Sequence, residues 1–472
     1  MSATKNSFDF NSLIENVDRK CRENVGNYLK TVDTSLDEKA ETIKAISWLD
    51  WVKPLNYIKV VHTDIPDFIL PKNCSGELID VKVFSKSGPD DKIYDTYKLV
   101  RDRVARGNCF LRITRGPHTG TRCILHALKK FTGGLGDDDD RDRGDNLTWK
   151  KYFVKSIDDA KKVIATRKAN GEAAHLSCIQ IDGQILLCAG SKNVHMLIRN
   201  RGDIALYRGD RYRIASEVSH AILDALDSME PSRKEMLLQF LIATRFTAVF
   251  EILSPDHQHV ENLSHLTKPV VQFITWTSTE LEPMPDQMLC TVPPHIGIEL
   301  ARALGLTTID YEVIDITEVF DRMKKIRQGY QYEGEVLYFL AEDGSVIGLL
   351  KKKTVWYILC RAIREKTRFS CAALLKSRGT FSKQKSISQV EKRLDEIQKW
   401  LLLSDQTIQK WKDLGTGFLV YCIQQIDSGN CQMEDIADRF PVVWKSYLEV
   451  HNYTDEITVQ CDVDVIDGEA SS

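Results

Sequence analysis

The chain has 472 residues, which is more than one ordinary domain holds, so two or three domains are expected. Its formal net charge is only -3, which excludes the global basic field of a nucleic-acid coat protein, so any nucleic-acid contact must come from a local patch. The 12 cysteines form no Cys-x-x-Cys pair, the first residues are polar, and no apolar run approaches the ~20 residues of a membrane span. We therefore expect reduced thiols, no membrane segment and a cytoplasmic or nuclear location.

The first part of the chain has helical patterning. Residues 1 to about 60 mix apolar and charged positions in a way typical of helices, and we expect residues 1–96 to form a mainly helical N-terminal region. Short apolar runs typical of strands follow between residues 97 and 131. The glycine- and aspartate-rich run at residues 133–145 indicates a loop, and we interpret its acidic block as a solvated insertion.

The middle of the chain alternates strands and helices. AHLSCIQI and QILLCA, residues 174–189, predict two strands joined by a tight turn at Asp182-Gly183, where both residues need positive φ. Residues 213–245 predict helices, and the runs at 245–253 and 268–276 predict strands. Residues 294–304 and 317–327 predict two further helices.

The last part begins with a second hairpin and continues as helices. EGEVLYFLAEDGSVIGLLKKKTVWY, residues 333–357, predicts two strands with a turn at Asp343-Gly344. Beyond it, apolar residues recur at helical spacing, as in SISQVEKRLDEIQKWLL. The expected fold class is therefore α+β, with antiparallel sheets flanked by helices at residues 97–357 and a helical C-terminal domain at 358–472.

One lysine stands at the start of the first hairpin. Lys168 belongs to a Lys-Ala-Asn-Gly sequence, and Gly171 would let the backbone pass close to a ligand. A lysine is a covalent nucleophile only when it is neutral, and its reference pKa near ~10.4 makes that form rare at pH 7. Nearby cations would lower the pKa of Lys168 and so activate its amine.

The sequence supplies such cations and two strand-bound carboxylates. Lys192 ends the first hairpin, and three lysines at 351–353 end the second. A group of lysines that repel one another needs an anionic partner, and a nucleoside triphosphate with a divalent metal fits that need. Glu251 and Glu333 lie in or beside strands, where they can hold a ribose hydroxyl or a metal. Glu335 alternates with Glu333 and is expected to face solvent.

The ordered set of these short sequences resembles a known superfamily. KANG, AGSKN, FEIL, EGEV and KKKTVWY resemble the motifs of covalent nucleotidyltransferases, namely ATP-dependent RNA and DNA ligases and mRNA capping enzymes. ARGNCF and LKKFTGGLG resemble stretches of the bacteriophage RNA ligase 1 type in particular. The resemblance covers about residues 97–357. The chain departs from the usual motif in having Asn170 where aspartate is more common and Glu172 where a small hydroxyl residue is common.

The resemblance implies an activity and a set of site residues. Lys168 would attack the α-phosphate of ATP to give a lysyl-AMP phosphoramidate, the AMP would move to an RNA 5′-phosphate, and an RNA 3′-hydroxyl would complete the joining in RNA repair or processing. ATP and Mg²⁺ (or Mn²⁺) are the implied cofactors, with Glu333 placing the metal, Glu251 holding the ribose, and Lys351 and Lys353 neutralising the α-phosphate. The residues expected to bind the nucleotide are Arg106, Lys130, Gly171, Lys192, Glu251, Glu333, Lys351 and Lys353.

Two other functions stay open on the sequence. One is another covalent nucleotidyltransferase, a DNA ligase or a capping guanylyltransferase, and the other is a non-catalytic RNA-binding relative. DNA ligases and capping enzymes are expected to continue into a β-rich domain after the last motif, whereas this chain continues with helical patterning. A scaffold would have no need of Lys168 or its accompanying charged residues.

Overall fold

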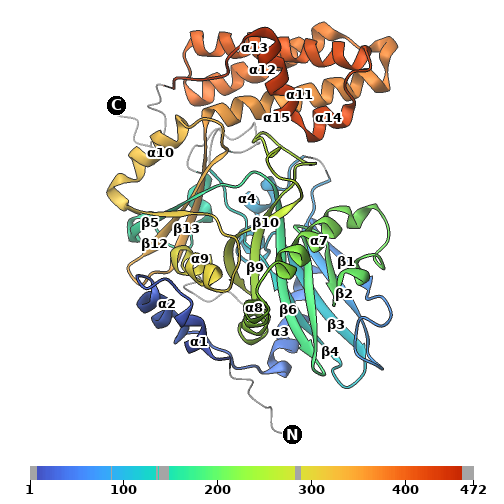
Figure 1. The fold of residues 1–472 in the computed structure, drawn as a ribbon, viewed down its shortest axis with the longest axis vertical. Coiled ribbons are helices and arrows are strands. Elements are labelled where there is room, and N and C mark those ends of the chain that lie inside the picture. The colour runs from blue at the N-terminus through green and yellow to red at the C-terminus, as the bar shows by residue number, and fades with distance from the viewer. Residues whose placement is uncertain (1–7, 87, 134–136, 138–147, 282–288, 460–472) are drawn as a thin grey trace.

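Three antiparallel sheets and the helices packed on them form the fold, as Figure 1 shows. The structure is a computed structural model that describes residues 8–86, 88–133, 137, 148–281 and 289–459. The expected mixture of helices with antiparallel sheets is confirmed. Within the described residues, the helices are all too short or too polar to cross a membrane.

The first sheet has the strand order β1-β2-β3-β4. Its strands are β1 (Ile58–Asp64), β2 (Ser75–Val83), β3 (Asn108–Arg115) and β4 (Gly120–His126). Strands β1 and β2 lie within residues 1–96, for which the sequence predicted mainly helix, and β2 pairs with β3 across the expected boundary at residue 96. The prediction missed these strands because their charged residues mask the alternation, and pairing with β3, a partner distant in sequence, stabilises the extended form.

Helices precede and interrupt this sheet. They are α1 (Phe10–Glu15), α2 (Arg22–Leu29), α3 (Glu38–Val52), α4 (Asp91–Thr96) and α5 (Lys98–Arg103). The helical prediction for residues 1 to about 60 is thus confirmed in outline. Trp48 of α3 packs on Phe110 of β3, with ring centroids 5.1 Å apart, so α3 covers the outer face of the sheet.

The second sheet has the order β10-β9-β6-β7-β8 and occupies the centre of the molecule. Its strands are β6 (Glu172–Ile181), β7 (Gln184–Ser191), β8 (His195–Ile198), β9 (Phe246–Leu253) and β10 (Val270–Ser278). The predicted hairpin turn is confirmed, with φ of 49° at Asp182 and 80° at Gly183.

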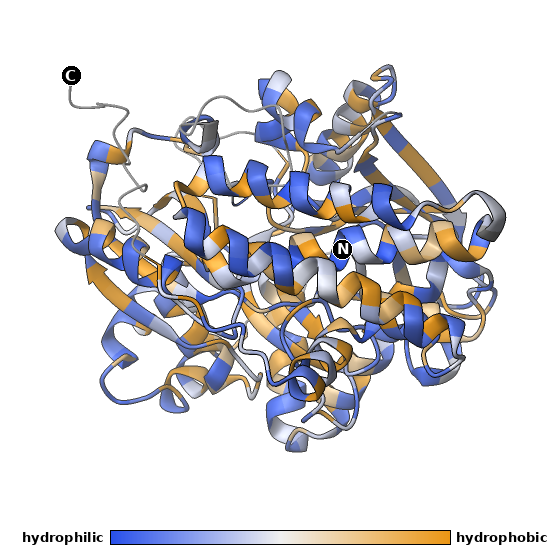
Figure 2. Ribbon diagram, turned by 90° about the horizontal axis from the view of Figure 1, so that it is seen from above, coloured by the Kyte–Doolittle hydropathy of each residue, from blue (hydrophilic) through white to orange (hydrophobic). Residues whose placement is uncertain are grey.

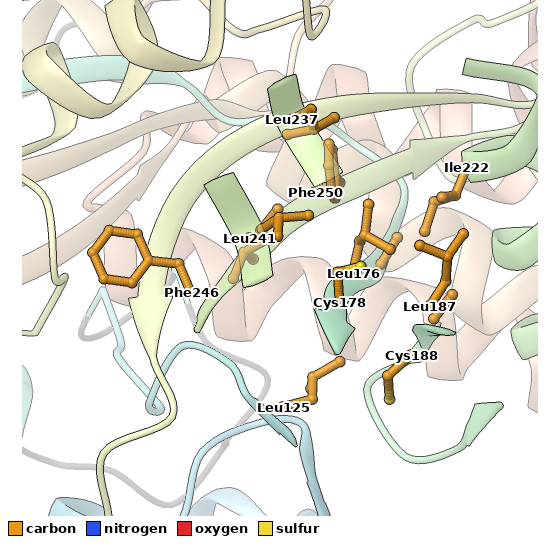
Figure 3. Close-up of a cluster of buried hydrophobic side chains, with 14 of the residues drawn as sticks. Leu125, Leu176, Cys178, Leu187, Cys188, Ile222, Leu237, Leu241, Phe246 and Phe250 are labelled. Carbon is orange, nitrogen blue, oxygen red and sulfur yellow. The ribbon is translucent and has the colours of Figure 1, made fainter. Parts of the chain in front are cut away.

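Helices and the first sheet cover opposite faces of this second sheet. The helices are α6 (Arg201–Ile204), α7 (Arg213–Asp227), α8 (Pro231–Thr244) and α9 (Pro294–Ala303). In Figure 3, Leu187 of β7 lies on the side of Ile222 of α7, whereas its neighbour Cys188 lies on the side of Leu125 of the first sheet. Apolar residues of both sheets and of α7 and α8 form one continuous core.

The third sheet carries the second predicted hairpin. Its order is β11-β5-β12-β13, with β5 (Ala160–Arg167), β11 (Tyr311–Asp315), β12 (Gly334–Ala341) and β13 (Val346–Lys353). The turn includes Gly344 at a φ of 80°, as the Asp-Gly sequence predicted. Helix α10 (Val319–Arg327) packs on this hairpin.

The described residues after β13 are helical up to residue 451, as predicted. The helices are α11 (Val355–Lys376), α12 (Lys383–Leu401), α13 (Asp405–Asp427), α14 (Met433–Asp438) and α15 (Phe440–His451). They share a core of their own, and Figure 2, seen from above these helices, shows the alternation of polar and apolar segments along them. Asp455 joins α11 and α15 to the segment before β12, because its carboxylate accepts hydrogen bonds from Trp356 Nε1 (2.8 Å), Trp444 Nε1 (2.8 Å) and the Tyr330 hydroxyl (2.7 Å).

Candidate active site

Lys168 lies where the second and third sheets meet. It follows β5 directly, and its backbone N–H donates to the carbonyl oxygen of Gly334 at 2.8 Å, which fixes the residue beside β12. Its Nζ is 3.1 Å from Oε1 of Glu333, and its side chain is only 22 % exposed. The amine therefore points into a group of charged residues and not into bulk water, which is the placement that a nucleophilic role requires.

The electrostatics around Lys168 differ from the expectation. The sequence predicted that neighbouring cations lower the pKa of Lys168. Burial does act to lower that pKa, but the carboxylates of Glu333 and Glu251 outweigh it and hold the pKa of Lys168 above its ordinary value. The raised pKa keeps this amine an ammonium, and attack on a phosphate requires that the charge of these carboxylates be offset first.

Glu333 is the central carboxylate of the site. It is 3 % exposed, and its Oε1 lies 3.6 Å from Nζ of Lys353 as well as 3.1 Å from that of Lys168. Burial opposes its ionisation, yet these two ammonium groups lower the pKa of Glu333 to about 2. Glu333 is thus a buried carboxylate that stays charged because cations surround it.

Asn170 organises the surroundings of Glu333, a role that the sequence analysis missed. Its Nδ2 donates to Oε2 of Glu333 at 2.6 Å and to the Tyr357 hydroxyl at 3.1 Å, while its Oδ1 accepts from the backbone N–H groups of Val260 (3.0 Å) and Glu261 (3.1 Å). All four hydrogen-bonding positions of this buried amide are satisfied. The network joins the Lys-Ala-Asn-Gly turn to the start of α11.

Gly171 serves the packing of strands. A Cβ at this position would lie 2.0 Å from the carbonyl oxygen of Ile252 in β9, so only glycine fits. Its N–H donates to Oε1 of Glu251 at 3.1 Å, which orients that carboxylate beside Lys168. The sequence expected Gly171 to allow a close approach to a ligand, whereas the close approach in the structure is to β9.

Glu335 does not face solvent as predicted. Its side chain is 13 % exposed, and its two oxygens accept from Nε and Nη2 of Arg322 in α10 at 2.7 and 2.9 Å. The alternation of the strand does place it away from Glu333, but α10 covers that side of β12. This helix is a tertiary partner that the period-2 pattern could not reveal.

A second group of cations surrounds two aspartates at the start of α4. Lys192 Nζ lies 2.8 Å from Oδ2 of Asp90, and Nζ of Lys130 forms an ion pair with Asp91. Burial opposes ionisation of Asp91, but Lys130, Lys351 and Arg106 hold the pKa of Asp91 well below its ordinary value. Asp90 and Asp91 were not predicted as site residues, since nothing next to them in the sequence marks them as partners of cations 15 to 260 positions away.

The second hairpin connects the two groups. Lys351 and Lys353 alternate on β13, as the sequence predicted, so one acts on Asp91 and the other on Glu333. Lys352 points to the other face, where its Nζ lies 3.5 Å from Oδ2 of Asp137. All of the lysines and carboxylates expected in the site therefore gather around one region of the fold.

Asp137 corrects the interpretation of the acidic run. We expected residues 133–145 to form a solvated insertion, but Asp137 is only 1 % exposed and accepts from both Nη atoms of Arg327 at 2.8 Å. It also accepts from the backbone N–H of Lys353 at 2.7 Å, so it supports the end of β13. The other acidic residues of the run lie outside the described residues.

The residues present fit an ATP-bound divalent metal. Carboxylate oxygens are the ligands that Mg²⁺ prefers, and Glu333 and Glu251, which both act on Lys168, could supply them. The cations on the α4 side provide the charge that phosphate groups need.

A family assignment follows from comparison with known proteins. Residues 78–364 match a family described as a domain of unknown function (DUF7920), and the chain belongs to this family. All of the predicted site residues, together with Asp90, Asp91 and Asn170, lie inside the matched segment. No curated protein matches the chain.

Proposed function

We propose that this protein is an ATP-dependent RNA ligase that works through a covalent lysyl-AMP intermediate on Lys168. The observation that carries the proposal is the position of the Lys168 amine, 3.1 Å from Glu333 and within the field of Glu251, at the edge of a group of lysines from three separate segments. The ordered motifs that resemble the bacteriophage RNA ligase 1 type support the same assignment.

The proposed reaction has three balanced steps. Lys168 Nζ, after losing its proton, forms a P–N bond to the α-phosphate of ATP while the P–O bond to pyrophosphate breaks. An oxygen of an RNA 5′-phosphate then takes the AMP and releases the lysine. The RNA 3′-hydroxyl finally attacks the activated 5′ end, forming a phosphodiester bond and expelling AMP.

The residues of the chain would act mainly by positioning and by neutralising charge. Lys351 and Lys353 would face the phosphates from one side of β13, with Lys130, Lys192 and Arg106 beyond them. Asp90, Asp91 and Glu333 form ion pairs with cations of this group. On binding, the phosphates of ATP would replace these carboxylates as the partners of the cations. A magnesium ion held by Glu333 would offset the charge of that carboxylate, which now keeps Lys168 protonated.

The C-terminal part favours an RNA ligase over the related enzymes. DNA ligases and capping enzymes would continue into a β-rich domain, whereas α11 to α15 follow β13 and have their own core. A joining reaction on RNA is therefore the activity that we propose, with RNA carrying a 5′-phosphate and a 3′-hydroxyl as the substrate.

The experiment is a joining assay on 5′-phosphorylated RNA with ATP and Mg²⁺. Circular or joined RNA should form with the wild-type protein and with Lys161→Ala, a change at an exposed lysine of β5, the strand that Lys168 follows, but not with Lys168→Ala. Joining of DNA alone would assign a DNA ligase, and labelling of the protein by GTP in place of ATP would assign a capping enzyme. Absence of every one of these products would contradict the proposal.

A further inference from the structure

A group of buried polar side chains lies between the first and second sheets, inside an otherwise apolar core. Each of them is at most 3 % exposed. They come from five strands of two sheets, and they are Asp80, Cys109, His175, Cys188 and His195.

Strand register places them all in one interface. Asp80 of β2 pairs with Cys109 of β3, so both side chains leave the same face of the first sheet. In the second sheet His175 and His195 both pair with Gly190, which puts the two imidazoles on one face. Cys188 lies two residues from Gly190 and therefore shares that face, toward Leu125 of the first sheet in Figure 3.

Three ligand atoms are close enough to share one ion. An oxygen of Asp80, the sulfur of Cys109 and a ring nitrogen of His195 all lie within 4.8 Å of one another. Zinc bonds to such atoms are about 2.0–2.3 Å long, so one ion between them needs shifts of only a few tenths of an ångström. Asp80 Oδ1 and His195 Nδ1 are now 2.8 Å apart, and binding would replace their hydrogen bond with two metal bonds.

Cys188 is the candidate fourth ligand. Its side chain neighbours that of Cys109 but lies outside the group of three close ligand atoms, so it would have to move toward them to provide a second sulfur. Two sulfurs, one imidazole and one carboxylate are ligands that zinc accepts in four-coordinate sites. Arg211 Nη2 lies 3.6 Å from Oδ2 of Asp80 and would offset the excess negative charge of two thiolates and a carboxylate.

The surroundings are built to hold the two imidazoles. Nε2 of His195 lies 3.3 Å from Nδ1 of His175, so the outer nitrogen of the metal-bound ring would donate to a second imidazole. A Cβ on Gly107 would lie 2.5 Å from Cε1 of His175, and one on Gly190 would lie 2.9 Å from Cδ2 of His195. Gly107 therefore leaves room for the His175 ring, whereas a Cβ on Gly190 would first meet the carbonyl oxygen of Val194, at 2.2 Å.

We propose that Asp80, Cys109, Cys188 and His195 bind one zinc ion, with His175 fixing the orientation of His195. The proposed ligands are each at most 3 % exposed, so the ion would be structural and would have no open position for a substrate. It lies behind the turn between β7 and β8, which carries Lys192. The ion therefore fastens that turn to the first sheet.

The test is metal analysis of untagged wild-type protein that has been purified without added metal. We expect about one zinc ion per chain, and Co²⁺ exchanged for it should give the sulfur-to-cobalt absorption of a thiolate site. Removal of zinc with a chelator should lower the unfolding temperature, and added zinc should restore it. Wild-type protein that contains no zinc, takes up no Co²⁺ and keeps its unfolding temperature in chelator would overturn the proposal and leave a metal-free Asp80–His195–His175 hydrogen-bond chain.

Variants separate the ligands from the rest of the core. Cys109→Ser and His195→Gln should lose most of the bound zinc, whereas Cys178→Ser, a buried cysteine on the opposite face of β6, should keep it. Equal zinc content in Cys109→Ser and Cys178→Ser would contradict the assigned ligand set. Zinc content reads this site directly, so the result stands whether or not the protein joins RNA.

Discussion

Replacing Gly171 by alanine tests how the site is assembled. The added Cβ would lie 2.0 Å from the carbonyl oxygen of Ile252, where ordinary contacts are 3.4–4 Å, so β6 and β9 must separate by more than an ångström at this point. Overpacking of this kind costs about 1–3 kcal/mol. Loss of the N–H donation to Glu251 costs about 1.5–3 kcal/mol more, because the acceptor is charged.

The expected loss for Gly171→Ala is therefore roughly 2.5–6 kcal/mol in the free energy of unfolding. The assay is denaturant unfolding with Gly379→Ala as the matched control, because a Cβ on Gly379 meets nothing within 4 Å. The control should stay within about 1 kcal/mol of the wild type. Equal stability of the two variants would refute the reasoning that strand packing, and not ligand contact, requires glycine at position 171.

Three further outcomes are expected. Asn170→Asp replaces a hydrogen-bond donor 2.6 Å from Glu333 with a second carboxylate, so the free energy of unfolding should fall by roughly 2–4 kcal/mol. Wild-type stability would contradict the assigned hydrogen bond, even though aspartate is the commoner residue in the motif. Asp455→Ala removes the acceptor of two buried indoles and a phenol, so it should cost about 3–5 kcal/mol and expose the C-terminal helices to limited proteolysis, whereas an unchanged digestion pattern would argue against that anchor. Burial and, to a lesser extent, Lys129 lower the pKa of His126 from about 6.5 to about 4 in the folded state. Between these two values the unfolded chain binds a proton that the folded chain does not, so the free energy of unfolding should fall by about 1.4 kcal/mol for each unit by which the pH decreases. His126→Gln should show a shallower decrease over that range, and an identical slope would exclude this histidine as its source.

Local signals in the sequence predicted the hairpins and the core of the site. Both Asp-Gly turns place their glycine at positive φ, and the first also places Asp182 there, which glycine and aspartate tolerate better than other residues. The ordered motifs also predicted that Lys168, Glu251, Glu333 and Lys353 meet. Each motif consists of a few consecutive residues in or beside a strand, so its local geometry can be predicted from the sequence alone.

Other features depended on partners far away in the sequence. Asp90 and Asp91 compensate Lys130, Lys192 of the β7–β8 turn and Lys351 of β13, and nothing next to them in the sequence indicates this. The raised pKa of Lys168 could not be predicted for the same reason. The sequence shows which cations and carboxylates are available, but not the distances from Lys168 that decide which of them have the larger effect. Asp137 was misjudged for the same reason.

Covalent labelling of Lys168 tests the central claim most directly. The purified protein should be incubated with ATP and Mg²⁺ and its intact mass measured, followed by peptide mapping of the adduct. We expect a gain of one AMP through an acid-labile bond at Lys168, present in Lys161→Ala and absent in Lys168→Ala. An unchanged wild-type mass, or an AMP attached at any other residue, would contradict it.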